Sequence, residues 1–83
     1  MSRAMKRLAA MKRNPKGDWT IADVEALCRG FEIECRPPSN GSHYVISHPL
    51  DPGMLTVPAR RPIKPIYIML VVELVECVLE KQR

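Results

Sequence analysis

The sequence predicts a small α+β domain in the order α-β-β-β-α: a three-stranded antiparallel sheet with two helices packed on one face. Apolar residues recur at helical spacing over residues 20–30 and again over 66–81. Between them lie three short segments that alternate apolar and polar residues, separated by proline, glycine, serine and asparagine. Strands joined by such short turns favour an antiparallel meander.

The chain has room for one domain. Its 83 residues are 46% hydrophobic and 27% charged, which is typical of a globular protein and not of a disordered one. A chain this short buries only roughly 60–65% of the surface that its unfolded state exposes. We therefore expect a substrate to lie on the surface. We divide the chain into a basic N-terminal extension, residues 1–17, and a single domain, residues 18–83.

The extension is rich in positive charge. Its basic residues, with no acidic residue among them, are Arg3, Lys6, Arg7, Lys12, Arg13 and Lys16. Such clusters favour polyanions such as nucleic acid, but a solvated tail is the interpretation we prefer for this one. Residues 2–12 are good helix formers without a strong apolar stripe, so we expect an extra helix there that is frayed or optional.

The first helix of the domain is predicted to begin after Thr20. Asp23 follows three residues later, which is a capping-box-like start. The apolar residues at helical spacing are Ile21, Val24, Leu27 and Cys28. Gly30 suits the C-terminal cap. We expect about three turns that bury one face.

Three strands are predicted next. Residues 31–36 alternate in the period of a half-buried strand and end in a turn at 37–41. The second strand spans 42–48. A turn at 50–53 then leads to a third strand at 54–57.

The last helix is predicted over residues 66–81. Pro65 fits its first turn, where a missing N–H costs no hydrogen bond. Its broad apolar face carries Tyr67, Leu70, Val71, Leu74, Val75 and Val78. We expect this helix to lie across the sheet.

The cysteines and the apolar runs indicate a cytoplasmic protein. Cys28, Cys35 and Cys77 are odd in number, lack C-x-x-C spacing and fall in apolar patterns, which is typical of reduced core residues. The basic start lacks the continuous apolar core of a secretory signal. The most apolar run, residues 65–72, is less than half of the ~20 residues that cross a bilayer.

The stretch GSHYVISHP raises the question of what its two histidines do. His43 and His48 are five residues apart, so in a regular strand they point to opposite faces and do not meet on one metal ion. The cysteines also lack ligand spacing, so we expect no metal and no cofactor. Tyr44 and Ile46 mark the inner face, which leaves His43 outward. We expect His48 to be structural, through a capping hydrogen bond or a packed ring.

Three motifs together resemble a known family. GFE-x-x-C-R, GSH-x-x-x-x-HP and LTVPA-x-R-P-I-KP follow one another within residues 18–76. This order resembles the HicA-type toxins of bacterial toxin–antitoxin pairs. The resemblance implies a fold like the double-stranded RNA-binding domain, cleavage of mRNA without a metal, and a HicB-type antitoxin as partner. It also implies that His43, in the GSH motif, is the catalytic histidine.

The chain departs from the family's pattern in three places. Its loop before GSH carries Pro37 and Pro38, where many relatives have a short link. Arg60 and Arg61 stand where many relatives carry a histidine soon after T-V-P. Residues 1–12 have no obvious counterpart. These departures concern the shape of the RNA surface.

The residue types suit RNA cleavage. RNA carries its own nucleophile, the 2′-hydroxyl beside the scissile phosphate, so one positioned acid or base and some positive charge suffice. An imidazole takes and gives protons near neutral pH because its ordinary pKa is about 6.5. The candidate RNA-binding residues are Arg36, Ser42, Arg60, Arg61 and Lys64.

Two other classes stay open. A domain of this type can grip RNA through helix ends and basic loops without cutting it. An exposed histidine is more often a bystander than a catalyst, but a pure RNA-binding module has no need of one, so His43 distinguishes the two classes. An antitoxin or DNA-binding regulator is disfavoured, because no helix-turn-helix pattern is present.

Overall fold

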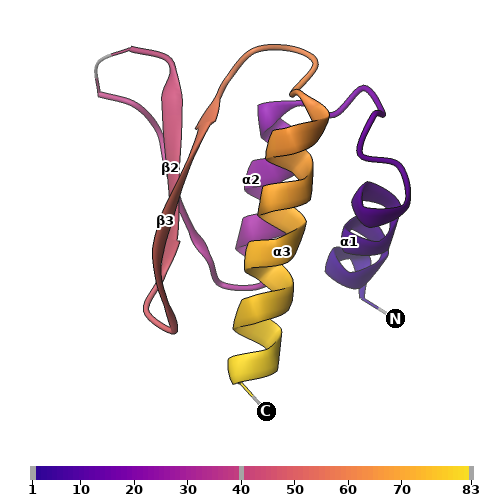
Figure 1. The fold of residues 1–83 in the computed structure, drawn as a ribbon, viewed down its shortest axis with the longest axis vertical. Helices are drawn as coiled ribbons and strands as arrows, with labels where there is room; N and C mark the ends of the chain where they lie inside the picture. Colours follow the sequence, from indigo (N-terminus) through magenta and orange to yellow (C-terminus); the bar gives the residue numbers. More distant parts are fainter. Residues whose placement is uncertain (1, 40, 83) are drawn as a thin grey trace.

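The computed structural model of the chain, shown in Figure 1, describes residues 2–39 and 41–82. In chain order, these residues form α1 (Arg3–Arg13), α2 (Ile21–Gly30), β1 (Glu34–Arg36), β2 (His43–His48), β3 (Asp51–Pro58) and α3 (Pro65–Lys81). The strands pair antiparallel in the order β1-β2-β3, which confirms the predicted meander. No helix in the described part of the chain has the length and apolar character needed to cross a membrane.

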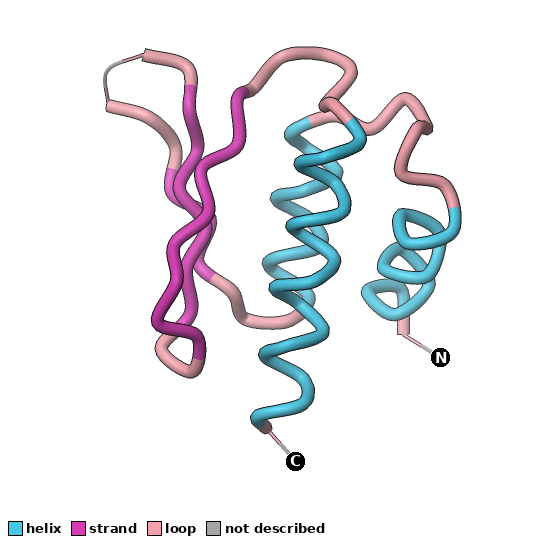
Figure 2. Tube along the Cα trace, in the orientation of Figure 1, coloured by secondary structure: helices cyan, strands magenta, loops and turns pink. Residues whose placement is uncertain are grey.

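The elements lie in three layers. Figure 2 shows the sheet on one side, α2 and α3 in the middle and α1 on the far side of these two helices. Helix α2 contacts β1 and α3 contacts β3, whereas α1 contacts both other helices. The α+β class is therefore confirmed, and a third helix is added outside the expected pair.

The main core lies between the sheet and the middle helices. Ile46 of β2, Val57 of β3, Leu27 of α2 and Val75 of α3 have no exposed surface. On β2, the burial of Ile46 and the exposure of His43 agree with the inner and outer faces assigned from the sequence. The sheet therefore presents His43 to solvent at the beginning of β2.

Helix α1 packs on the core, contrary to the expectation of a frayed or optional helix without an apolar stripe. Ala4, Leu8 and Met11 are buried, and Met11 has no exposed surface. The hydroxyl of Ser2 caps the helix by accepting the N–H of Met5 at 3.1 Å. These three buried residues recur at i, i+4 and i+7, which is the spacing of one helix face, and basic residues cover much of the rest, so the expectation that the segment lacks an apolar stripe is wrong.

The close approach of α1 to α2 explains Gly30. A Cβ on Gly30 would lie 2.5 Å from the Cβ of Ala4, which is inside the normal contact distance. The left-handed residue that turns the chain out of α2 is Glu32, with φ of 57°, so the assignment of Gly30 to a C-terminal cap is wrong. At the other end of α2, the predicted capping box is confirmed, because the Thr20 N–H donates to Asp23 at 2.8 Å.

Two strand boundaries differ from the sequence prediction. β1 begins at residue 34 rather than 31, because residues 31–33 are used to leave α2. β3 begins at Asp51, so the turn between β2 and β3 lies at residues 49 and 50 rather than at the predicted 50–53. The side chain of Asp51 accepts a hydrogen bond from the N–H of Gly53 at 2.9 Å, within the first residues of β3.

Candidate active site

The open end of the β2–β3 hairpin holds the GSH motif in place. His43, the first residue of β2, is the register partner of Pro58, the last residue of β3. The pairing continues beyond the strands, where the Ala59 N–H donates to the Ser42 carbonyl oxygen at 2.9 Å. The residues that enter β2 are therefore fixed beside those that leave β3.

Residues 59–64 connect β3 to α3 and are anchored by Ile63. The Ile63 side chain is only 2% exposed. Its N–H donates to the carbonyl oxygen of Trp19 at 2.8 Å. This anchor holds the segment against the domain while Arg60 and Lys64, on either side of it, stay exposed.

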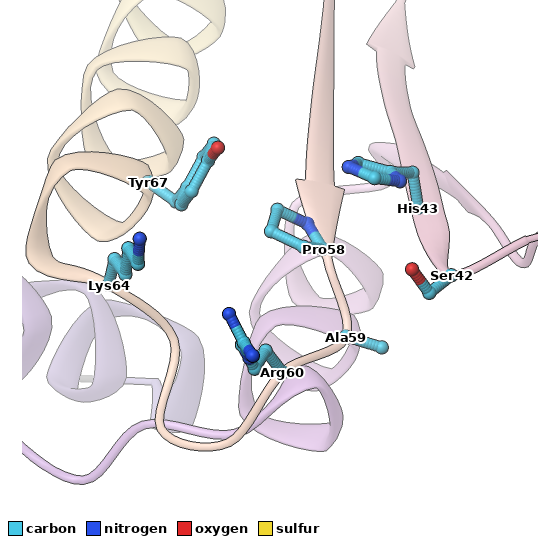
Figure 3. A pocket seen from close by; sticks show the side chains of 7 residues that line it. All are labelled: Ser42, His43, Pro58, Ala59, Arg60, Lys64 and Tyr67. Carbon is cyan, nitrogen blue, oxygen red and sulfur yellow. The ribbon is translucent and has the colours of Figure 1, made fainter.

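A groove with a volume of about 560 Å³ lies between the hairpin end and the start of α3. The residues that line it, drawn in Figure 3, are Ser42, His43, Pro58, Ala59, Arg60, Lys64 and Tyr67. In Figure 3, His43 and Tyr67 face this space from opposite sides, with Pro58 between them. We call this cavity the His43 groove.

The His43 groove is basic. Arg60 and Lys64 line it, and no acidic residue does. Neither cation takes part in an ion pair within the described residues. The first turn of α3, just after Lys64, contains no acidic residue and no side-chain cap, so the positive end of the helix dipole is not compensated there. The groove therefore favours an anionic ligand.

Two of the predicted RNA-binding residues lie outside this lining. Arg36, at the end of β1, pairs with Glu34 at 2.5 Å. A guanidinium nitrogen of Arg61 lies 3.7 Å from a carboxylate oxygen of Asp18. Of the six site residues taken from the sequence, the groove brings together Ser42, His43, Arg60 and Lys64.

Tyr67 is a lining residue that the sequence analysis placed only on the apolar face of its helix. Tyr67 is half-buried, packs against the hydrophobic core and still reaches the groove. Lys64 precedes it by three residues, a spacing that puts two side chains on the same side of a helix turn. This Lys-x-x-Tyr spacing indicates that Tyr67 lies near Lys64, but only the fold shows that the hairpin end lies opposite them.

His48 lies at the opposite end of β2 and does not line the groove. Its Nδ1 accepts a hydrogen bond from the N–H of Leu50 at 3.0 Å, which is the expected capping role beside the turn. The two histidines of β2 therefore have different surroundings. His48 provides a matched control for His43 in experiments.

Neither thiols nor metal ligands gather at the groove. Cys28 and Cys35 form a hydrogen-bonded pair between α2 and β1; this bond and burial raise the pKa of the Cys28 thiol. The same hydrogen bond lowers the pKa of Cys35. All three cysteines are free, and none of them lines the groove. The described residues contain no group of three or more His, Cys, Asp or Glu side chains that could hold a metal ion.

Comparisons of the chain with protein-family models, with curated proteins and with solved structures found no match.

Proposed function

We propose that this protein is a cytoplasmic endoribonuclease that cleaves mRNA and so stops translation, as the toxin of a type II toxin–antitoxin pair. The observation that carries the proposal is the His43 groove, in which an exposed imidazole lies in one basic cavity with Arg60 and Lys64. The GSH and T-V-P motifs that resemble HicA-type toxins supply the two strand ends of this cavity. The proposal includes a domain related to the double-stranded RNA-binding fold, with α1 as an addition.

The reaction needs only groups that the chain and the RNA supply. The 2′-oxygen attacks the adjacent phosphorus and the 5′-oxygen leaves, giving a 2′,3′-cyclic phosphate and a free 5′-hydroxyl. His43 takes the proton from the 2′-hydroxyl, gives a proton to the leaving oxygen, or does both in turn. A positioned acid or base of this kind typically contributes ~10²–10⁴-fold to the rate.

The remaining groove residues bind and orient the phosphate. Arg60 and Lys64 offset the negative charge that grows on the phosphoryl oxygens in the transition state. The exposed hydroxyl of Ser42, next to His43, orients the imidazole or the substrate. Arg36 and Arg61 lie outside the groove lining, each beside an acidic side chain, so in this proposal they contribute little to phosphate binding compared with Arg60 and Lys64.

A HicB-type antitoxin is the proposed protein partner. An open surface site that cuts mRNA harms its host unless another molecule covers it. The groove is positively charged, so the covering surface should be acidic and should contact His43 and Arg60 together. Interactions between opposite charges mainly accelerate association, so salt should slow binding more than it speeds release.

The test is induction of the protein alone in a bacterium, beside His43→Ala and His48→Ala variants expressed to the same level. We expect growth arrest and loss of full-length mRNA with the wild type and with His48→Ala, but not with His43→Ala. If the wild type and His43→Ala both arrested growth and left mRNA intact, the protein would be a non-catalytic RNA-binding module.

A further inference from the structure

We propose that Tyr67 makes the His43 groove selective for single-stranded RNA, by stacking on the base of a nucleotide next to the scissile phosphate. This inference rests on the proposed ribonuclease function and names its substrate class. The juxtaposition that carries it is an aromatic ring, an imidazole and two cations lining one groove.

The ring of Tyr67 is held in place at the groove. Tyr67 lies in the first turn of α3, one turn after Lys64, and packs against the hydrophobic core. In Figure 3 its side chain extends from α3 toward the hairpin end and faces His43 across Pro58. A ring that is fixed on one side and open to the groove on the other is a flat apolar surface beside two phosphate-binding cations.

The cations alone do not select one form of RNA. Contacts to phosphate fix a nucleic acid in position, but they carry no information about its bases and fit a duplex as well as a single strand. A base inside a duplex is stacked on both sides and cannot reach a protein ring, whereas a base in a single strand can turn out and stack on an aromatic side chain. Tyr67 therefore adds selectivity that Arg60 and Lys64 lack.

The lining of the groove offers separate places for the base and the phosphate of one nucleotide. The base would lie on Tyr67, at the α3 side, while the adjacent phosphate would lie between Lys64, Arg60 and His43. Stacking on an aromatic ring tolerates every base, because each base has a π face. We therefore expect weak sequence preference together with strong preference for single strands.

Cleavage rates alone do not reveal the contribution of Tyr67, because in-line attack at the phosphorus requires a flexible nucleotide and therefore favours single strands with or without the ring. Binding measurements separate the two effects. The measurement uses His43→Ala protein, which leaves the RNA intact, with a labelled mixed-sequence single strand and the corresponding duplex. We expect Tyr67→Leu to weaken single-strand binding by roughly 5- to 150-fold. Duplex binding should stay unchanged, and Tyr67→Phe should bind the single strand like the parent, because stacking uses the ring and not the hydroxyl.

The chain offers a matched control in its second tyrosine. Tyr44 is half-buried in β2 and does not line the groove, so Tyr44→Leu should leave both affinities unchanged. In the active protein, Tyr67→Leu should raise KM more than it lowers kcat. A further measurement keeps the native ring: a single strand carrying 5-iodouridine should photo-cross-link to Tyr67, identified by mass spectrometry.

Two results would overturn the stacking inference. One is an equal loss of single-strand and duplex affinity in Tyr67→Leu, which would make the ring only a support for α3. The other is no loss at all together with a cross-link elsewhere, which would place the base outside the groove. Failure of the proposed function looks different: the wild type would cleave no RNA, whatever the binding experiments show.

Discussion

At the residue scale, Arg60 and Arg61 are neighbours in sequence but lie in different surroundings. Arg60 lines the His43 groove, whereas Arg61 lies beside Asp18 on the exposed surface. From the sequence, both were equal candidates for phosphate binding. A strand end followed by a proline-containing loop does not indicate which of the two arginine side chains faces the groove. The structure distinguishes them through Ile63, whose burial fixes the loop.

The salt dependence of RNA binding tests this difference. Each phosphate contact to a single strand contributes about 0.7 to the slope of log affinity against log salt. We expect Arg60→Ala, in the His43→Ala protein, to reduce the magnitude of the slope by about 0.7 and Arg61→Ala to leave it nearly unchanged. Equal slopes for the two variants would place the phosphates along the outside of the loop.

The thiol pair gives a second prediction at this scale. The thiolate is the reactive form, and the hydrogen bond with Cys28 lowers the pKa of Cys35. In a Cys77→Ala background, iodoacetamide should therefore modify Cys35 at a lower pH than it modifies an ordinary cysteine peptide. Adding Cys28→Ala removes the hydrogen bond and should move the pH profile of alkylation upward; a profile that did not move would show that the pair has no such effect.

At the element scale, α1 adds apolar packing to a domain for which the sequence indicated only an optional helix at this position. It covers α2 and α3 on the side away from the sheet and places Met11 in the core. Lys12 also pairs with Glu76 of α3, but that pair is exposed and contributes little to stability. The packing of α1 is therefore mainly apolar.

Two methionines of α1 provide a matched comparison. Met11 is fully buried and Met5 is 38% exposed, in the same helix. Met11→Ala should lower the free energy of unfolding by about 2–5 kcal/mol, because it removes transfer energy and leaves a cavity. Met5→Ala should change it by less than about 0.5 kcal/mol, as surface substitutions usually do. Urea unfolding measures both, and equal small effects would mean that α1 is not docked in solution.

The elements differ in how far the sequence could define them. The capping box at Thr20 and the alternation around Ile46 are local patterns, and both were predicted correctly. The docking of α1 depends on the surfaces of α2 and α3, which the periodicity of one segment does not describe. The cavity likewise depends on the register of His43 with Pro58 and on the contact of Ile63 with Trp19, both of which join distant residues. His43 was identified from its motif, but Tyr67 required the fold.

At the scale of the whole molecule, the positive charge of the groove and its access to solvent determine which kind of partner can regulate it. The chain carries a formal net charge of +4, and the described groove has cations on its lining without acids. The residues that line the groove are mostly exposed in the described part of the chain. We therefore propose that a partner of opposite charge, the proposed antitoxin, controls the activity by covering the groove.

Binding of the proposed antitoxin should map to the groove. Hydrogen exchange should slow at residues 42–44 and 58–64 on addition of the antitoxin, and cleavage should stop at the same stoichiometry. Arg60→Ala should reduce the association rate more than it increases the dissociation rate, because charge steers the encounter. Protection confined to the C-terminal half of α3, with cleavage intact, would exclude inhibition by covering the groove.

The central claim is that the His43 groove cleaves RNA, and the most direct measurement is the initial rate of single-strand cleavage by purified protein in excess chelator. We expect the wild type and a folded His48→Ala variant to produce 2′,3′-cyclic phosphate and 5′-hydroxyl ends. His43→Ala should be slower by at least ~10²-fold while its unfolding curve stays that of the wild type. Cleavage by His43→Ala at the wild-type rate would contradict the claim.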